Sequence, residues 1–312
     1  MNDIRSDFKL DRNQEIYEEH VNTGASYNEL AKKYDLSPQR ISSIIKDVKD
    51  KGLNSKLITE SPKEERERYK NLAVELREQG KLELALSMLD SVVSWDAANN
   101  NARGQVDALG HKKITLTLMA DSSTDSSQKR QLLSQAVEIV EEALKIAESG
   151  DERLKGAVVT QKVQYASLLI KQSEFLDVKA KAEQLRKALE TLDSCIKVFP
   201  GSEAHKAWPL AIKANALHEL GRYDDSINTL HEAQKALFSG YDGEIKGADQ
   251  APMKLRVWNS GIMLGFSKIF ADTNKPVLAE VYAMAVVQTP DPEGVLTARK
   301  KEAKAIIEKI SQ

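Results

Sequence analysis

The amino-acid sequence predicts an all-α protein in which a small three-helix domain precedes a longer body of helical repeats. Three observations lead to this prediction. The chain of 312 residues is too long for one compact helical core. Apolar residues recur at helical spacing, and few windows alternate apolar and polar residues as a half-buried strand does. One spacing of small and apolar residues also returns several times along the second part of the chain, as in a repeat protein.

The predicted boundaries follow from the places where these patterns begin and end. We expect a tail over residues 1–11, a first domain over residues 12–52 and a linker over residues 53–60. Helical repeats are expected over residues 61–291, and a C-terminal capping helix is expected over residues 292–312. The chain therefore combines a small head with a body several times its size.

The first helix of the head is expected over residues 12–21. Ile16, Tyr17 and Val21 lie near one face of that helix, and the Asn-Thr-Gly stretch at residues 22–24 ends it. Because the other side of the segment is polar and charged, the helix is expected to bury only this one face.

Two further helices follow, with a turn at Asp35 and Leu36 between them. Ser26 can cap the second helix, and Ser37 can cap the third, whose first position holds Pro38. The positions expected to be buried recur at helical spacing: Leu30, Ala31, Tyr34, Ile41, Ile44, Ile45 and Val48. The opposite face of the third helix carries polar and basic side chains: Gln39, Arg40, Ser42, Ser43 and Lys46.

This part of the chain resembles the helix-turn-helix domains of bacterial and phage DNA-binding proteins over about forty residues. The stretch that carries the resemblance is SYNELAKKYDLSPQRISSIIKDVK. Its marks are the small Ala31, the apolar Leu36 in the turn, the capping Ser37, and the pair Ile41 and Ile45. The resemblance implies that the third helix enters the major groove of double-stranded DNA. The residues implied are Gln39, Ser42 and Ser43 at the bases, Arg40 and Lys46 at phosphate or an outer base, and Ser37 at the helix end.

Charge is distributed unevenly in the head, although the whole chain is close to neutral. The 45 basic and 47 acidic residues give a net charge of -2, so the protein is not a polycation that coats nucleic acid. Residues 32–56 carry seven basic and three acidic side chains, whereas residues 1–31 carry three basic and seven acidic ones. The basic half contains the third helix, as phosphate contact requires. Because this patch is small and the fold is reused, a head that binds protein or RNA is the alternative.

Two stretches of the body share one spacing. The matched positions are Gly80, Leu82, Ala85, Leu89 and Val92 and, in the same order, Gly221, Tyr223, Ser226, Leu230 and Ala233. Parts of the pattern return at Ala136, Val140 and Ala143, at Ala188, Leu192, Cys195 and Pro200, and at Ala279, Ala283 and Val286. The spacing resembles the tetratricopeptide repeat, a helix pair of about 34 residues. Glycine between the helices allows a left-handed turn, and a small residue on the second helix lets the first approach closely.

We expect about five helix pairs in the body. Residues 64–93 and 207–237 form the most regular pairs, while the others have longer first helices or inserted loops. A polar loop is expected over residues 121–127, and a connection rich in Gly and Asp over residues 239–251. The last segment, residues 292–310, suits a capping helix because its apolar side chains form one stripe. The stripe consists of Leu296, Ala303, Ile306, Ile307 and Ile310.

The resemblance to tetratricopeptide repeats also implies a concave surface that binds a peptide or an extended protein segment. The residues implied on this surface are Lys70, Val74 and Arg77 in the first pair, Asn215 and His218 in the fourth, and Lys268 in the last. Asn215 offers a donor and an acceptor to a peptide backbone. Lys70, Arg77 and Lys268 could each take a carboxylate. The alternative for every one of these residues is ordinary solvated surface.

The sequence contains none of the common signatures of catalysis or metal binding. It has no Gly-rich phosphate loop, no HExxH spacing and no paired cysteines, and its five histidines are scattered. Cys195 is the one cysteine and is expected in a helix interface. The N-terminal residues lack the apolar core of a signal peptide, and no run of about 20 apolar residues could span a bilayer. We therefore expect a cytoplasmic, non-enzymatic protein without a cofactor and without a membrane partner.

The combined layout resembles the peptide-responsive tetratricopeptide-repeat transcription regulators of bacteria and phages. It implies a DNA-binding head whose activity is controlled by a peptide or protein in the groove of the body. The alternative is an interaction scaffold, in which the repeats recruit a protein and the head only localises the assembly or binds protein. We also expect a homodimer, because one three-helix head contacts few base pairs and a two-fold site supplies the rest. The interface is expected in the body or its last helix.

Overall fold

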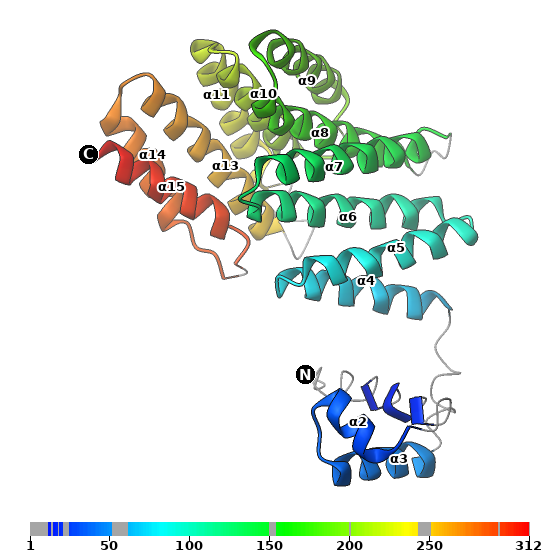
Figure 1. Ribbon diagram of the computed structural model, residues 1–312. Coiled ribbons are helices and arrows are strands. Elements are labelled where there is room, and N and C mark those ends of the chain that lie inside the picture. Colours follow the sequence, from blue (N-terminus) through cyan, green and yellow to red (C-terminus); the bar gives the residue numbers. More distant parts are fainter. Residues whose placement is uncertain are drawn as a thin grey trace. The chain divides into compact units, whose positions relative to one another are not determined.

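The computed structural model describes residues 12–13, 15–17, 19–20, 25–51, 62–149, 154–199, 201–242, 251–292 and 294–311. Within these ranges the chain forms helices and short connections without a strand (Figure 1), so the all-α prediction is confirmed. The chain divides into two compact units, Met1–Arg68 and Tyr69–Gln312. This division lies inside the helix α4, Pro62–Glu78, whereas the linker expected over residues 53–60 lies outside the described residues.

The head contains the helices α2, Tyr27–Tyr34, and α3, Pro38–Lys51, and the described residues between 12 and 20 are also helical. Ser26 begins α2 with a capping box, because it exchanges hydrogen bonds with Glu29. The six buried side chains of the head form one apolar core: Ile16, Leu30, Ala31, Ile41, Ile44 and Ile45. Val21, the stop at residues 22–24, the side chain of Val48 and the tail over residues 1–11 lie outside what the structure describes.

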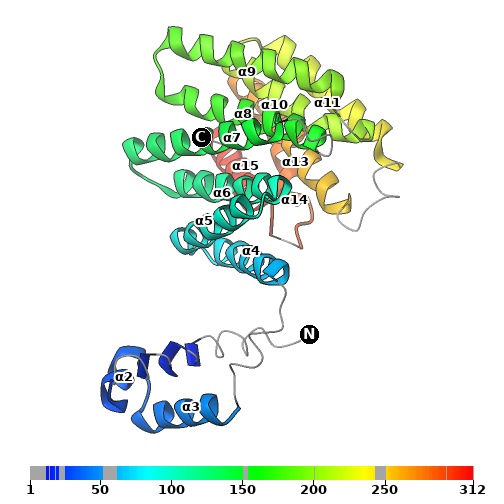
Figure 2. The ribbon, with the colours of Figure 1, turned by 90° about the vertical axis from the view of Figure 1, so that its right-hand side faces the viewer.

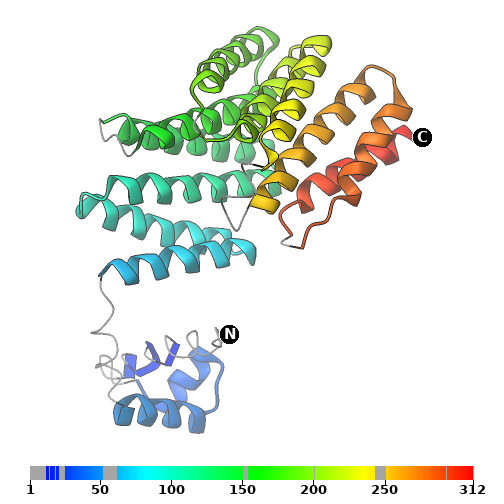
Figure 3. The same ribbon diagram turned by 180° about the vertical axis from the view of Figure 1, so that it is seen from behind.

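The body stacks its helices in consecutive antiparallel pairs, seen from the side in Figure 2 and from behind in Figure 3. The described residues give five pairs, which agree in number with the sequence prediction. Their further members are α5, Leu82–Ala98; α6, Ala102–Ser122; α7, Ser126–Ala147; α8, Lys155–Gln172; α9, Val178–Val198; α10, Ala207–Glu219; α11, Tyr223–Ser239; α13, Ala251–Asp272; and α14, Pro276–Gln288. Short 3-10 turns, η3 (Ser173–Phe175) and η4 (Glu203–Lys206), precede α9 and α10.

Left-handed residues make the turns within three of these pairs. Gly80 and Gly221 have φ values of 76° and 72°, and no atom lies within 4 Å of the position that a Cβ would take. Backbone conformation alone therefore explains why glycine stands there. The turn between α13 and α14 has the same form, with Asn274 at φ 55°. In this turn the backbone N–H of Lys275 donates to the Phe270 carbonyl at 2.8 Å, as a helix-ending turn of this kind requires.

A buried contact between small residues joins the two helices in two of these pairs. Ser226 of α11 donates to the Ala214 carbonyl of α10 at 2.6 Å. Ser267 of α13 donates to the Ala279 carbonyl of α14 at 2.8 Å. In this pair the serine is therefore on the first helix, whereas Ser226 is on the second helix of its pair. Side chains of this size let the two backbones approach closely, as the repeat pattern predicts.

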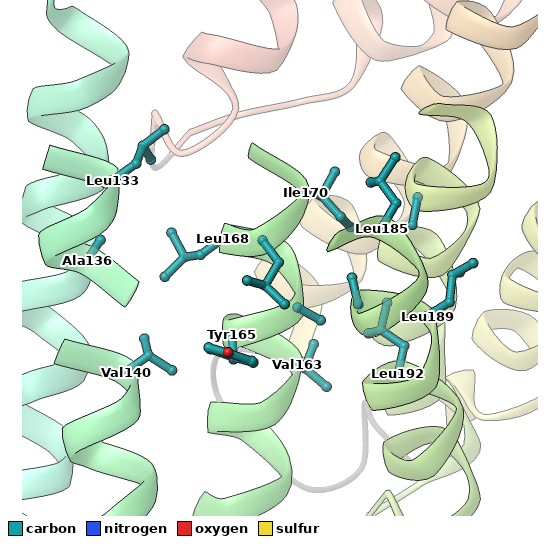
Figure 4. Close-up of a cluster of buried hydrophobic side chains, with 14 of the residues drawn as sticks. Leu133, Ala136, Val140, Val163, Tyr165, Leu168, Ile170, Leu185, Leu189 and Leu192 are labelled. Carbon is teal, nitrogen blue, oxygen red and sulfur yellow. The ribbon is translucent and has the colours of Figure 1, made fainter. Parts of the chain in front are cut away.

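The middle of the body holds the largest apolar cluster, drawn in Figure 4. Side chains from α7, α8 and α9 meet there, among them Leu133, Val163, Leu185 and Leu192. Cys195 is buried in the same cluster, and its burial raises the pKa of the thiol. The thiol is therefore an ordinary packing group, as expected from the sequence.

Two connections differ in detail from the sequence prediction. The polar loop predicted over residues 121–127 is shorter, because α6 continues to Ser122 and α7 begins at Ser126. Asp125 caps α7 by accepting from the backbone N–H groups of Ser127 and Gln128. In the connection over residues 239–251, α11 ends at Ser239, α13 begins at Ala251, and residues 243–250 lie outside the described part.

The last helix, α15 (Thr297–Ile310), covers the end of the repeat stack. Leu296 and Ala303 are completely buried, while Ile306 and Ile307 pack against an apolar cluster of α13 and α14. Arg299 fixes the helix further by donating to the Ser260 hydroxyl at 2.9 Å and to the Val257 carbonyl. Its remaining outer positions are mainly charged or small, as expected for a capping helix.

Candidate DNA interface and partner groove

The head presents one exposed polar face on α3. Ile41, Ile44 and Ile45 point into the core, and this fixes the rotation of the helix about its axis. The six residues singled out from the sequence are all exposed: Ser37, Gln39, Arg40, Ser42, Ser43 and Lys46. Core packing therefore leaves the whole predicted contact set on the surface, although their contact with DNA remains a prediction.

Ser37 organises the N-terminal end of this face. Its hydroxyl oxygen accepts from the backbone N–H of Arg40 at 3.2 Å, and its carbonyl accepts from the N–H of Ile41 at 3.0 Å. These bonds begin the helix as the sequence predicts. The partial positive charge at the N-terminus of a helix favours an anion such as phosphate near this point.

Glu19 of the first helical segment contacts the C-terminal end of α2, next to the turn between α2 and α3. The Glu19 carboxylate accepts from the Lys33 ammonium at 2.7 Å and from the Tyr34 hydroxyl at 2.6 Å. Partial burial and the bond to Glu19 raise the pKa of Tyr34, so its hydroxyl stays protonated and keeps donating. The first helical segment is thereby tied to α2 by polar contacts as well as by the apolar core.

In the body, the predicted partner-binding residues of α4 contact the next first helix, α6. The Lys70 ammonium lies 3.5 Å from the Asp107 carboxylate, and an Arg77 guanidinium nitrogen lies 3.3 Å from the His111 ring. Burial lowers the pKa of Arg77. Val74 is half-buried between them on α4. These side chains therefore serve contacts between repeats, in addition to any contact with a partner.

The other predicted residues lie in separate places along the body. His218 of α10 is 2.9 Å from the Asp272 carboxylate of α13, and Lys268 of α13 is 2.6 Å from the Glu302 carboxylate of α15. Asn215 is exposed on α10. The structure thus does not bring the predicted set into one cluster, because its members lie on three first helices, α4, α10 and α13.

A groove between α6 and α8 gathers the strongest candidate residues for partner binding. It encloses about 470 Å³ and has both polar and apolar walls. Its lining consists of Arg103, Val106, Asp107, Gly110, His111, Ile114, Leu154, Gly156, Ala157, Thr160, Gln161 and Gln164. Gly110 lies in the interior of α6, where a Cβ would meet only Gln161 Nε2 at 3.9 Å, so its lack of a side chain widens the groove.

Two glutamines of α8 give this groove its chemistry. Gln161 is 5% exposed, and its Oε1 has no hydrogen-bond partner. Gln164, one turn further along the groove, has a buried Oε1 without a partner as well. Two buried acceptors without donors cost about 1–3 kcal/mol each unless something supplies an N–H or O–H. The residues predicted from the sequence to bind a partner did not include these two glutamines. The one sequence signal of the groove was Gly110, a glycine in the middle of a predicted helix.

The described part of the chain offers no group of His, Cys, Asp and Glu side chains that could hold a metal ion. Among the described helices, none is long and apolar enough to cross a membrane.

Comparison with known proteins links the head to a family of transcription factors. Residues 5–57 match the model of the Mor transcription activator family, which covers the predicted helix-turn-helix but not the body. A search of curated proteins found no match to the sequence. Among solved structures, the chain is similar to the crystal structure of Bacillus thuringiensis PlcR in complex with the peptide PapR7 and DNA. The TM-score is 0.46 at 10% identity, and the alignment covers 95% of this chain and 98% of that chain.

Proposed function

We propose that this protein is a non-enzymatic transcription regulator whose helix-turn-helix head binds double-stranded DNA and whose repeat body binds a controlling peptide or protein segment. One observation carries the proposal for the head. The apolar core holds α3 so that a capped, polar face with Arg40 and Lys46 is wholly exposed. The match of residues 5–57 to a transcription activator family supports the same assignment.

The proposed roles in DNA binding follow the chemistry of the α3 face. Gln39, Ser42 and Ser43 read base edges through amide and hydroxyl groups, and Arg40 and Lys46 neutralise phosphate or an outer base. Ser37 keeps its hydroxyl hydrogen for phosphate while its oxygen caps the helix. Because binding would release the cations condensed on DNA, the affinity for DNA should fall steeply as the salt concentration rises.

The experiment for the head is a site selected from a random DNA library, measured with the full chain. We expect Gln39→Ala with Arg40→Ala to weaken binding to that site at least tenfold, because a good side-chain contact to a base is worth about 1–3 kcal/mol. The matched control is Arg130→Ala with Gln135→Ala, which removes the same side chains from exposed positions of α7. Unchanged affinity in a folded head variant would refute the assignment of α3 to the groove.

The chemistry of the groove between α6 and α8 indicates what kind of partner the body binds. Gln161 and Gln164 present acceptors that need N–H donors, and a peptide backbone supplies such donors along its length. Val106, Leu154 and Ala157 provide an apolar wall for a side chain of the same segment. Arg103 is exposed at the groove and suits an acidic group. This chemistry supports a short peptide or an extended protein segment.

Control of the head by the body requires a partner that binds one state of the protein better than another. We expect Gln161→Met with Gln164→Met to leave the DNA affinity of the purified protein within about twofold while changing regulation of a reporter in cells. The same comparison applies to Arg77→Ala, Asn215→Ala and Lys268→Ala. If all these variants regulate like the wild type, and removal of residues 62–312 also leaves regulation unaltered, the protein is a scaffold and not a regulated switch.

A further inference from the structure

Lys113 of α6 is a partly buried lysine without a counter-ion. Within the described part of the chain, its ammonium has neither a hydrogen-bond partner nor a carboxylate within ion-pair distance. Burial and, to a smaller extent, the ammonium of Lys171 lower the pKa of Lys113 to about 8. The protein itself therefore stabilises the charged form of this side chain poorly.

The other partly buried lysines of α6 and α8 each have a carboxylate beside them. The pairs are Lys112 with Asp90 at 2.6 Å, Lys162 with Glu148 at 2.9 Å, and Lys171 with Asp121 at 2.8 Å. The lysines predicted from the sequence to take a carboxylate, Lys70 and Lys268, are paired as well. Lys113 differs from all of these because its charge is left for another molecule to neutralise.

The position of Lys113 follows from the register of α6 against α8. Two contacts fix that register: the 3.9 Å between Gln161 Nε2 and the Cβ position of Gly110, and the 2.8 Å bond from Lys171 Nζ to the Asp121 carboxylate. Three residues beyond Gly110 and Gln161, the same register places Lys113 opposite Gln164. One donor and two acceptors, all without partners, therefore belong to adjacent turns of the groove between α6 and α8.

The chemistry of these three side chains suits an acidic segment. The glutamine acceptors need N–H groups, which a peptide backbone supplies, whereas the ammonium needs an anion. One helical turn rises about 5.4 Å, and two residues of extended chain span about 6.6 Å. A segment whose backbone N–H reaches Gln161 can therefore place a carboxylate at Lys113 within about two residues.

We infer that Lys113 binds a carboxylate of the partner, so that the segment bound between α6 and α8 is acidic at one fixed position. This inference rests on the proposed function of the groove and adds the residue that selects the partner. Arg103, the other cation of the groove, is exposed, and an exposed ion pair contributes little free energy. The carboxylate belongs either to an Asp or Glu side chain or to the C-terminus of a peptide.

Selection of random short peptides on the full chain tests this inference. Wild type, Lys113→Met and Lys145→Met serve as parallel baits, and the last of these removes an exposed lysine of α7 as the matched control. We expect wild type and Lys145→Met to enrich peptides with a carboxylate at one fixed position. Lys113→Met should lose this preference and keep the others.

The affinities of one enriched peptide, synthesised with a free or an amidated C-terminus, measure the contact directly. Replacing its Asp or Glu by the corresponding amide should weaken binding to the wild type about tenfold, because a hydrogen bond between charged groups is a strong one. If the C-terminus supplies the carboxylate, amidation has this effect instead. Neither change should affect binding to Lys113→Met, whose circular dichroism spectrum should match that of the wild type.

Binding to Gln161→Met with Gln164→Met locates the peptide, because a peptide in the groove should lose affinity for this variant at least tenfold. A carboxylate preference that survives in Lys113→Met would overturn the inference, and so would enriched peptides that bind equally well without a carboxylate. Either result would leave the proposed groove standing if the glutamine variant still weakens binding. If no bait enriches a peptide, the proposed function of the body is wrong and the role of Lys113 is refuted with it.

Discussion

Two sets of buried polar side chains in the body differ in their hydrogen bonds. In the C-terminal pairs, Ser226 and Ser267 each donate to a carbonyl of the helix packed against them. In the middle of the body, the buried Oε1 atoms of Gln161 and Gln164 have no partner, and Lys113 of α6 is partly buried. A group buried without a partner destabilises the free protein unless a ligand completes it. We therefore expect the serines at the helix crossings to stabilise the solenoid and the two groove glutamines to belong to the part that binds.

The largest effect that would test this contrast is overpacking of a small-residue crossing. Ser226 is completely buried between α10 and α11, so Ser226→Leu should lower the free energy of unfolding by about 3 kcal/mol. Ser226→Ala, the matched control, should cost about 1 kcal/mol, because it removes one hydrogen bond but keeps the size. Urea unfolding followed by circular dichroism measures both variants.

The same measurement on the groove should give a change of the opposite sign. Gln161→Met keeps the length of the side chain and removes the buried acceptor that has no partner. We expect it to raise the free energy of unfolding by about 1 kcal/mol while it weakens the response to a partner. If Gln161→Met destabilises the free protein as Ser226→Ala does, Gln161 is a structural residue and the contrast fails.

Replacing Lys113 should change the free energy of unfolding by an intermediate amount that depends on pH. Burial, with a smaller contribution from the nearby Lys171, lowers the pKa of Lys113 from 10.5 to about 8. Between pH 8 and 10.5 the unfolded chain holds more protons than the folded one, so this lysine destabilises the fold at pH 7 and ceases to do so as the pH rises. We expect Lys113→Met to add on the order of 1–2 kcal/mol at pH 7, with the gain disappearing by about pH 10.5.

Unfolding in urea at pH 7, 9 and 10.5 measures this difference between Lys113→Met and the wild type. Lys145→Met, at an exposed position of α7, is the control and should stay within about 0.5 kcal/mol of the wild type at every pH. A gain for Lys113→Met that is constant over the range would mean that its ammonium is solvated in the folded protein.

The sequence predicted much of the fold because short-range signals determine it. The caps at Ser26 and Ser37 and the left-handed turn at Gly221 are local features, and each is present in the structure. The sequence pattern did not identify Asn274 as the equivalent of the turn glycines, because asparagine indicates a left-handed residue less strongly than glycine does. The repeat spacing at Ala279 was nevertheless recognisable.

The partner groove was much harder to predict than the DNA interface. The exposed face of α3 follows from one helix and its own periodicity, so a linear pattern finds it. Gln161 belongs to the groove only because α6 and α8 lie side by side and Gly110 leaves space between them. Such a site is formed by residues far apart in the chain, and one sequence does not contain the distances between them.

The smallest expected change in the free energy of unfolding comes from replacing two glycines, Gly221 and Gly110. Gly221 is left-handed with open space around it, so Gly221→Ala is opposed by the backbone alone and should cost about 1 kcal/mol. Gly110 has helical backbone, and an added Cβ would meet Gln161 Nε2 at an ordinary 3.9 Å, so Gly110→Ala should gain up to about 1 kcal/mol from helix propensity. Gly80→Ala, at φ 76°, is the control and should behave like Gly221→Ala. Because the added methyl narrows the groove, Gly110→Ala should also weaken regulation in cells. A stabilised Gly110→Ala protein that regulates normally would leave glycine without a role in the groove and move the partner site elsewhere on the body.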